Sequence, residues 1–259
     1  MNTRKTLPAL LVPIVAIAIW KGAVLFFDIP SHVLPAPEVV AVRLGDIVFS
    51  SILWGHLATT LTEILIGFSS GVILGAFAGY CLARAPTVEK ILSPFILVFQ
   101  TAPKISLAPM FVLWFGLGLS SKTVLIALVT FFPLMLNIMV GIRSVNPDYL
   151  YLLRILHARP FQRIFKVELM SAMPYLMTGL RVALVLSVTS AIIGEMMGAK
   201  SGLGFLLMTG NEMYDIPLVI ATILIISLLS WSFDAGMKLL QNRLLIWHES
   251  AIQNDLEVT

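Results

Sequence analysis

The chain has 259 residues, of which 58% are hydrophobic and 12% are charged, whereas an average soluble domain has about 45–50% and about 25%. A soluble fold of this size could not bury so many apolar side chains, so the composition indicates an integral membrane protein. The net charge of +3 does not indicate nucleic-acid binding, because the positive residues lie between apolar blocks and not on one basic face. The single cysteine, Cys81, excludes an intrachain disulfide.

The apolar residues form blocks of about twenty, which matches a hydrocarbon core about 30 Å thick. Six spanning helices are predicted, at residues 7–27, 57–83, 91–115, 122–142, 172–197 and 216–240. Helices are favoured over barrel strands because the blocks are continuously apolar and do not alternate. The first block is too long for a signal-peptide core, and we expect it to be retained. The expected fold class is all-α, a polytopic helical bundle that forms one transmembrane domain over residues 1–259, with a short interfacial helix at 38–49.

Lysine and arginine are concentrated on one side of the predicted bundle, and this bias predicts its orientation. With the N-terminus in the cytoplasm, eleven are cytoplasmic: Arg4, Lys5, Arg84, Lys90, Arg143, Arg154, Arg159, Arg163, Lys166, Lys238 and Arg243. Three lie outside: Arg43, Lys122 and Lys200. Both termini are then cytoplasmic, and the longest cytoplasmic connection covers residues 143–171.

The second span carries glycines at a strict interval of four: Gly67, Gly71, Gly75 and Gly79. Such a stripe lets another helix approach closely, because helix association in lipid depends on packing. We expect helix packing here, either as an ordinary structural contact or as a sliding one.

Four ionisable residues lie at membrane depth, where such residues are functional candidates by default: Glu63, Lys104, Arg181 and Glu195. Pro103 loosens the helix beside Lys104, and a broken helix at membrane depth usually lines a cavity. Pro103, Lys104, Arg181 and Glu195 are therefore candidates for a translocation path or gate. Alternatively, helix-end carbonyls or an acidic partner satisfy Lys104, and Arg181 reaches the interface or pairs with Glu63.

The cytoplasmic connection contains a predicted elbow. Asn146-Pro147-Asp148 has the form of a helix start, with proline near the first helical position and an acid in the first turn. Three leucines then recur at a spacing of three: Leu150, Leu153 and Leu156. The short, partly amphipathic helix ends near His157, and Pro160 can begin the next one. Such an elbow is suited to docking another protein.

Several segments carry a family resemblance. They are Thr101-Ala102-Pro103-Lys104, Ala108-Pro109, Leu113-Trp114-Phe115-Gly116, Met173-Pro174-Tyr175, Thr178-Gly179-Leu180-Arg181, Gly194-Glu195-Met196-Met197-Gly198-Ala199 and Gly202-Leu203-Gly204. With them, over most of residues 55–240, the chain resembles the permease subunits of type I ATP-binding-cassette importers, in the group associated with nitrate, sulfonate, taurine and bicarbonate uptake.

That family has a cytoplasmic loop written E-A-A, three residues, glycine, nine residues, then I-x-L-P. In register, Tyr151-Leu152-Leu153 lies over E-A-A, His157 over the glycine, and Val167-Glu168-Leu169-Met170 over I-x-L-P. Tyr151 has no carboxylate for the contact that the family's glutamate makes with the ATPase, so that contact must differ or be absent. The glycine supports a left-handed turn, which histidine adopts less comfortably than glycine.

The resemblance implies a permease subunit in a bacterial inner membrane, surrounded by lipid, that forms the path for a small organic or inorganic anion. It also implies two cytoplasmic ATPase subunits, a second permease copy or close relative, and an extracytoplasmic solute-binding protein. The residues implied in coupling to the ATPase are Tyr149, Leu150, Tyr151, Leu152, Leu153, Arg154, Leu156, His157, Ala158 and Arg159.

No catalytic motif is present in the sequence, and the four histidines lack metal-ligand spacing. We therefore expect no enzyme activity, no metal and no cofactor of the chain's own, with ATP and Mg²⁺ bound by the partner subunit. The alternative from another class is a self-sufficient secondary transporter driven by an ion gradient, which often shows internal repeats. No convincing repeat relates the two halves of this sequence.

Overall fold

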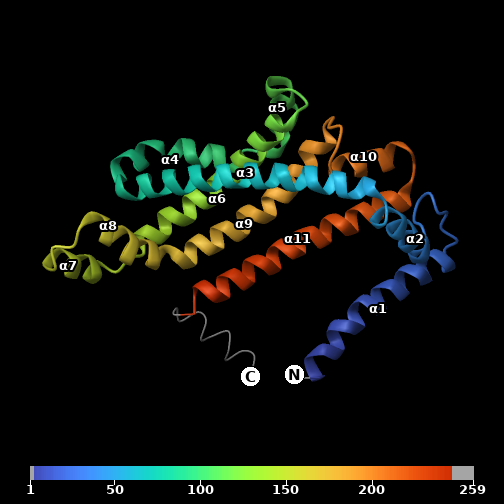
Figure 1. Cartoon of the computed structure of the whole chain (residues 1–259), viewed down its shortest axis with the longest axis horizontal. Coiled ribbons are helices and arrows are strands. Elements are labelled where there is room, and N and C mark those ends of the chain that lie inside the picture. Colours follow the sequence, from blue (N-terminus) through green and yellow to red (C-terminus); the bar gives the residue numbers. More distant parts are fainter. Residues whose placement is uncertain (1–2, 247–259) are drawn as a thin grey trace. The chain divides into compact units, whose positions relative to one another are not determined.

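A computed structural model describes residues 3–246, with side chains from residue 11 onward. All regular elements of this described part are helical (Figure 1), which confirms the predicted fold class. The side chains of Arg4 and Lys5, and residue His248, lie outside the described part. The chain separates into two compact units, one formed by Met1–Thr59 and Lys200–Leu228 and the other by Thr60–Ala199 and Leu229–Thr259.

The first unit combines the N-terminal helices with two helices near the C-terminus. It comprises α1 (Thr3–Phe26), α2 (Pro37–Val48), the first residues of α3 (Ser51–Arg84), α10 (Leu203–Glu212) and the first part of α11 (Ile216–Leu244). Helix α2 is the predicted interfacial helix. Its Arg43 pairs with Asp215, whose carboxylate also accepts a hydrogen bond from the Leu218 N–H (3.0 Å) and so caps α11.

The second unit contains the remainder of α3 and α11 and the central part of the chain. Its other elements are α4 (Pro86–Thr101), the 3₁₀-helix η1 (Lys104–Leu107), α5 (Ala108–Phe115), α6 (Leu119–Arg143), α7 (Pro147–Ile155), α8 (Pro160–Arg163), the π-helix η2 (Ile164–Glu168) and α9 (Leu169–Met196). Helices α6 and α9 lie side by side (Figure 1). Small residues allow this contact, because a Cβ on Gly179 would lie 2.9 Å from the Asn137 Cβ.

The glycine stripe of α3 faces α6. A Cβ on Gly67 would lie 2.6 Å from the Ile126 Cβ, and one on Gly75 would lie 2.6 Å from the Phe131 carbonyl oxygen. Real Cβ contacts are not this short, so α3 and α6 can pack at this distance only while these positions lack side chains. Gly71 and Gly79 meet α6 in the same way.

Four helices of the described residues are long and apolar enough to cross a membrane: Ser51–Arg84, Leu119–Arg143, Pro160–Met196 and Ile216–Leu244. The span predicted over 91–115 is two helical pieces bent by 79°, and the break lies at Pro103, where the sequence predicts a loosened helix. Counted as one broken span, it makes a fifth. The predicted first span corresponds to α1, whose described apolar part is Leu11–Phe26.

Candidate functional site

The break between α4 and η1 creates the first candidate site. Ala102 is extended (ψ 140°), as expected for a residue before proline. Pro103 has no N–H to continue the helix, and the next piece, η1, begins in a new direction at Lys104. The sequence pattern that predicted loosening at this point therefore produces a sharp bend.

An open cavity of about 600 Å³ lies at the bend, lined by the end of α4, by η1, and by α6 and α9. Most of its lining is apolar, and its polar side chains are Gln100, Lys104 and Asn137. Pockets that bind small molecules have this character, with a few polar groups in an apolar wall. Of the candidate path residues, Pro103 and Lys104 line this cavity, and Arg181 and Glu195 do not.

Lys104 has no carboxylate partner among the described residues. Its Nζ donates to the Gln100 carbonyl oxygen (2.7 Å) and lies 5.0 Å from the ring centroid of Phe132. This carbonyl corresponds to the alternative in which helix-end carbonyls satisfy the lysine. However, an ammonium has three N–H donors, and this carbonyl accepts from one of them. A neutral carbonyl also does not cancel the positive charge of Lys104, so that charge is available to a solute in the cavity.

Arg181 has a different partner from the one considered on sequence grounds. Its guanidinium binds Asp234 of α11 through two hydrogen bonds, of 2.5 and 3.2 Å, and Asp234 also pairs with Lys238 (3.0 Å). The expected alternative of an Arg181–Glu63 pair is wrong, because Glu63 pairs with Lys122. The sequence alone does not give the rotation of each helix about its axis, which decides the partner.

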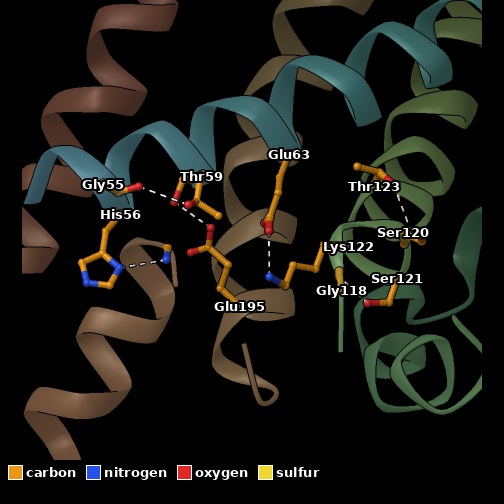
Figure 2. Close-up of polar contacts among 12 residues, drawn as sticks. Gly55, His56, Thr59, Glu63, Gly118, Ser120, Ser121, Lys122, Thr123 and Glu195 are labelled. Atoms are coloured by element: carbon orange, nitrogen blue, oxygen red, sulfur yellow. Dashed lines mark hydrogen bonds and ion pairs between the residues drawn. The ribbon is translucent and has the colours of Figure 1, made fainter. Parts of the chain in front are cut away.

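Lys122 and Glu63 form a buried ion pair between α6 and α3 (Figure 2). The Lys122 Nζ lies 2.7 Å from the Glu63 Oε1, and the two side chains are 6% and 1% exposed. Lys122 belongs to the outer group of the charge count, but its side chain is buried and is not exposed to solvent on that side. A mid-span glutamate requires a cation, and Lys122 at the start of α6 reaches inward to provide it. Glu195 of α9 is buried too, and its carboxyl accepts a hydrogen bond from the Thr60 hydroxyl (2.6 Å).

The predicted elbow is the second candidate site. The Asn146 side chain accepts a hydrogen bond from the Asp148 N–H (2.9 Å) and caps α7, as the Asn146-Pro147-Asp148 pattern predicts. His157 ends the helix with φ 49°, the left-handed conformation expected at the family's glycine position. Pro160 begins α8.

The elbow exposes large apolar side chains. They are Tyr149, Tyr151, Leu152, Ile155, Leu156, Phe161 and Phe165. Leu150 and Leu153 are instead partly buried, and Leu153 lines a groove beside Lys166 and Met170. Of the three leucines at a spacing of three, Leu150 and Leu153 therefore pack partly inward, and only Leu156 is exposed for docking.

A buried carboxylate anchors the elbow to the end of α3. Glu168, 2% exposed, accepts hydrogen bonds from Arg84 (2.7 Å to each oxygen) and from the Arg163 Nε (2.6 Å). Charge-assisted hydrogen bonds of this kind are among the stronger polar contacts in proteins. We call these three residues the elbow clamp.

The sequence model of one family, described as "Binding-protein-dependent transport system inner membrane component", matches residues 71–246. The chain belongs to this family. It is a permease subunit of an ABC importer, a multi-pass inner-membrane protein whose ATPase is a separate subunit. This confirms the resemblance and gives no support to a self-sufficient secondary transporter.

Relatives of the permease carry different substrate names. The putative aliphatic sulfonates transport permease protein of Bacillus subtilis is 32% identical, over 93% of this chain and 87% of that protein. The formylaminopyrimidine transport permease protein of Halalkalibacterium halodurans is 36% identical, over 89% of this chain and 92% of that protein. A solved structure of inward-facing MetNI, a methionine ABC transporter, has a TM-score of 0.60 at 19% identity, covering 79% of this chain and 96% of that chain. It shows that the permease has the type I importer fold.

Sequence reasoning about the permease missed the elbow clamp. Glu168 occupies the variable position of the family's I-x-L-P, so no motif letter marks it. One signal was available. Glu168 is the only acidic residue between Arg154 and the start of the fifth predicted span at residue 172, a stretch that otherwise carries several basic residues. An acid in that position needs a cation if the chain buries it.

Proposed function

We propose that this permease forms the translocation path for a small solute with an anionic group, and that the cavity at the α4–η1 bend is part of that path. The observation that carries the proposal is Lys104, an ammonium at a mostly apolar cavity, with no carboxylate partner among the described residues. An anionic group would supply the missing countercharge. The names of the relatives, which include an aliphatic sulfonates permease, agree with this class but do not fix it.

Uptake by the complete importer, reconstituted with its ATPase and binding protein, tests this proposal. With an aliphatic sulfonate as the probe, Lys104→Met should lower uptake at least about tenfold, since one lost charge-assisted contact corresponds to about 1.5–3 kcal/mol. Lys104→Arg should retain most uptake because it keeps the charge. Lys90→Met changes an exposed lysine of the preceding helix, α4, outside the cavity lining, and serves as the matched control. Equal uptake by Lys104→Met and Lys90→Met would contradict the proposal.

We propose further that the elbow docks the ATPase, which binds ATP and Mg²⁺. The excess of lysine and arginine on one side supports a cytoplasmic elbow and cytoplasmic termini, and it remains eleven to two once buried Lys122 is removed from the outer count. The exposed aliphatic and aromatic side chains of α7 and α8 supply the apolar anchors that protein interfaces use. A second permease subunit and an extracytoplasmic binding protein would complete the importer.

Charged substitutions on the exposed side of α7 test the docking. Ile155→Asp with Leu156→Asp should weaken retention of the ATPase about five- to a hundredfold, because losing interface anchors costs on the order of 1–3 kcal/mol. Abundance in the membrane should not change, since both side chains are exposed in the free subunit. Asp148→Asn, an exposed change at the start of the same helix, is the control. Co-purification of the ATPase measures the effect, and normal retention by the double variant would rule out docking through this surface.

A further inference from the structure

The elbow exposes basic side chains beside its apolar ones. Arg154 lies at the end of α7, Arg159 lies just before α8, and Lys166 lies in η2. All three are exposed, and none of them pairs with a carboxylate among the described residues. We call these three residues the basic patch of the elbow.

The acidic residues of the elbow do not offset this charge. Glu168 is buried and is already held by Arg84 and Arg163, so the elbow clamp contains two cations for one carboxylate. Asp148, at the start of α7, is exposed and forms no ion pair among the described residues. The elbow therefore carries an excess of positive charge at its surface.

Local helix electrostatics explains only part of the basic patch. Arg154 lies in the last turn of α7, where a cation is favourable. Arg159 instead precedes Pro160, the first residue of a helical run that continues to Met196. The N-terminus of a helix favours an anion and disfavours a cation. Arg159 is therefore not placed to stabilise its own helix, and an anion from outside the described residues would be favourable there.

The basic patch is interleaved with exposed apolar side chains. Phe161 and Phe165, whose ring centroids lie 4.3 Å apart, are exposed between Arg159 and Lys166 along the chain. Lys166 also lines a groove of about 260 Å³ together with Leu152 of α7. Helices α7 and α8 lie together beyond the ends of α6 and α9 (Figure 1). Apolar anchors beside charged groups are the composition of a protein interface, in which the charges select a complementary partner.

The other anionic surface at the cytoplasmic ends of the spans is that of lipid headgroups. Asp148 precedes Leu152 by four residues and Ile155 by seven, so it shares the exposed apolar face of α7 with them. A carboxylate within that face disfavours contact with an anionic lipid surface. A protein surface can place a single cation against it and carboxylates elsewhere, so the arrangement favours a protein.

We propose that the elbow selects an ATPase whose docking surface is acidic, with carboxylates placed against Arg154, Arg159 and Lys166. This inference rests on the proposed docking of the ATPase through the elbow, and it adds the chemistry of the partner. Opposite charges speed the encounter of the two subunits, and an ATPase with a basic docking surface is rejected because like charges would meet.

The association rate of the co-purifying ATPase with the permease in nanodiscs of neutral lipid tests the proposal. Arg154→Glu with Arg159→Glu should slow association at least about tenfold at low salt, because electrostatic steering raises such rates about ten- to a thousandfold. Arg154→Gln with Arg159→Gln should slow it less. Wild-type association should also slow as salt screens the charges. Lys90→Glu with Arg243→Glu makes the same charge change at exposed positions outside the elbow, and association should stay near the wild-type rate.

The apolar double variant Ile155→Asp with Leu156→Asp separates this inference from docking itself. If that variant loses the ATPase while the charge-reversed variant and high salt leave the association rate unchanged, the elbow docks the ATPase but the acidic partner surface is wrong. If neither variant affects the ATPase, docking through the elbow is wrong as well. A charge effect that appears in nanodiscs with phosphatidylglycerol and is absent in neutral ones would assign the basic patch to lipid headgroups and overturn the proposal.

Discussion

The Glu63–Lys122 pair and the elbow clamp both bury a glutamate, but they differ in where the cation lies. Lys122 is 6% exposed, so both members of the pair in α3 and α6 are out of water. In the clamp, Glu168 is 2% exposed whereas Arg84 and Arg163 are 35% and 38% exposed. Removing one partner therefore leaves a stranded charge in the first region, while arginines in the second can hydrate again. The energetic importance of a buried acid depends on whether its partner can reach water.

The largest effect is expected from Lys122→Met. It leaves Glu63 without a cation in the membrane core, which should lower the free energy of unfolding by about 3–5 kcal/mol. Glu63→Leu combined with Lys122→Met removes both charges and should recover most of that loss, because apolar replacements of buried ion pairs are often neutral. Unfolding of the purified permease in detergent measures both variants. A double variant as unstable as Lys122→Met would show that the loss does not come from a stranded charge.

A smaller effect is expected from Glu168→Gln. The amide keeps one acceptor but loses the charge that holds both arginines, so the unfolding free energy should fall by about 1–3 kcal/mol. Because the clamp joins the elbow to α3, proteolysis near residue 160 should become faster before global unfolding changes. If Glu168→Gln destabilised the permease as much as Lys122→Met, the solvent exposure of the cation would not determine how much each buried glutamate contributes to stability.

The smallest effect is expected from Arg163→Gln. Glu168 keeps Arg84 on both oxygens, and the lost contact belongs to a cation that is one-third exposed. We expect a loss below about 1 kcal/mol, in the range of partly exposed ion pairs. Unfolding measured at low and high salt provides the check. A loss larger than that of Glu168→Gln would mean that Arg163 has a further role at the elbow.

Local features of the fold followed from the sequence, because their causes lie within a few residues. Asn146 and Pro147 begin α7 through side-chain capping and a fixed φ, and His157 ends it in a left-handed turn. Pro103 breaks the third predicted span for an equally local reason. The angle of that break, 79°, and the cavity beside it depend on how α6 and α9 pack against the two pieces.

The sequence by itself determined that the chain is a helical membrane protein and where most of its spans lie, because the free energy of transferring apolar side chains into lipid adds up along consecutive residues. It also determined which family the chain resembles, because the family motifs are short contiguous segments. The tertiary structure alone decided which charges meet: Lys122 with Glu63, Arg181 with Asp234, and Glu168 with two arginines. The pairs Lys122–Glu63, Arg181–Asp234 and Arg84–Glu168 join residues of different helices, whereas Arg163 lies five residues before Glu168 in the same helical run. The rotation of each helix, set by close contacts such as the glycines of α3 against α6, selects the partner, and no local pattern in the sequence records that rotation.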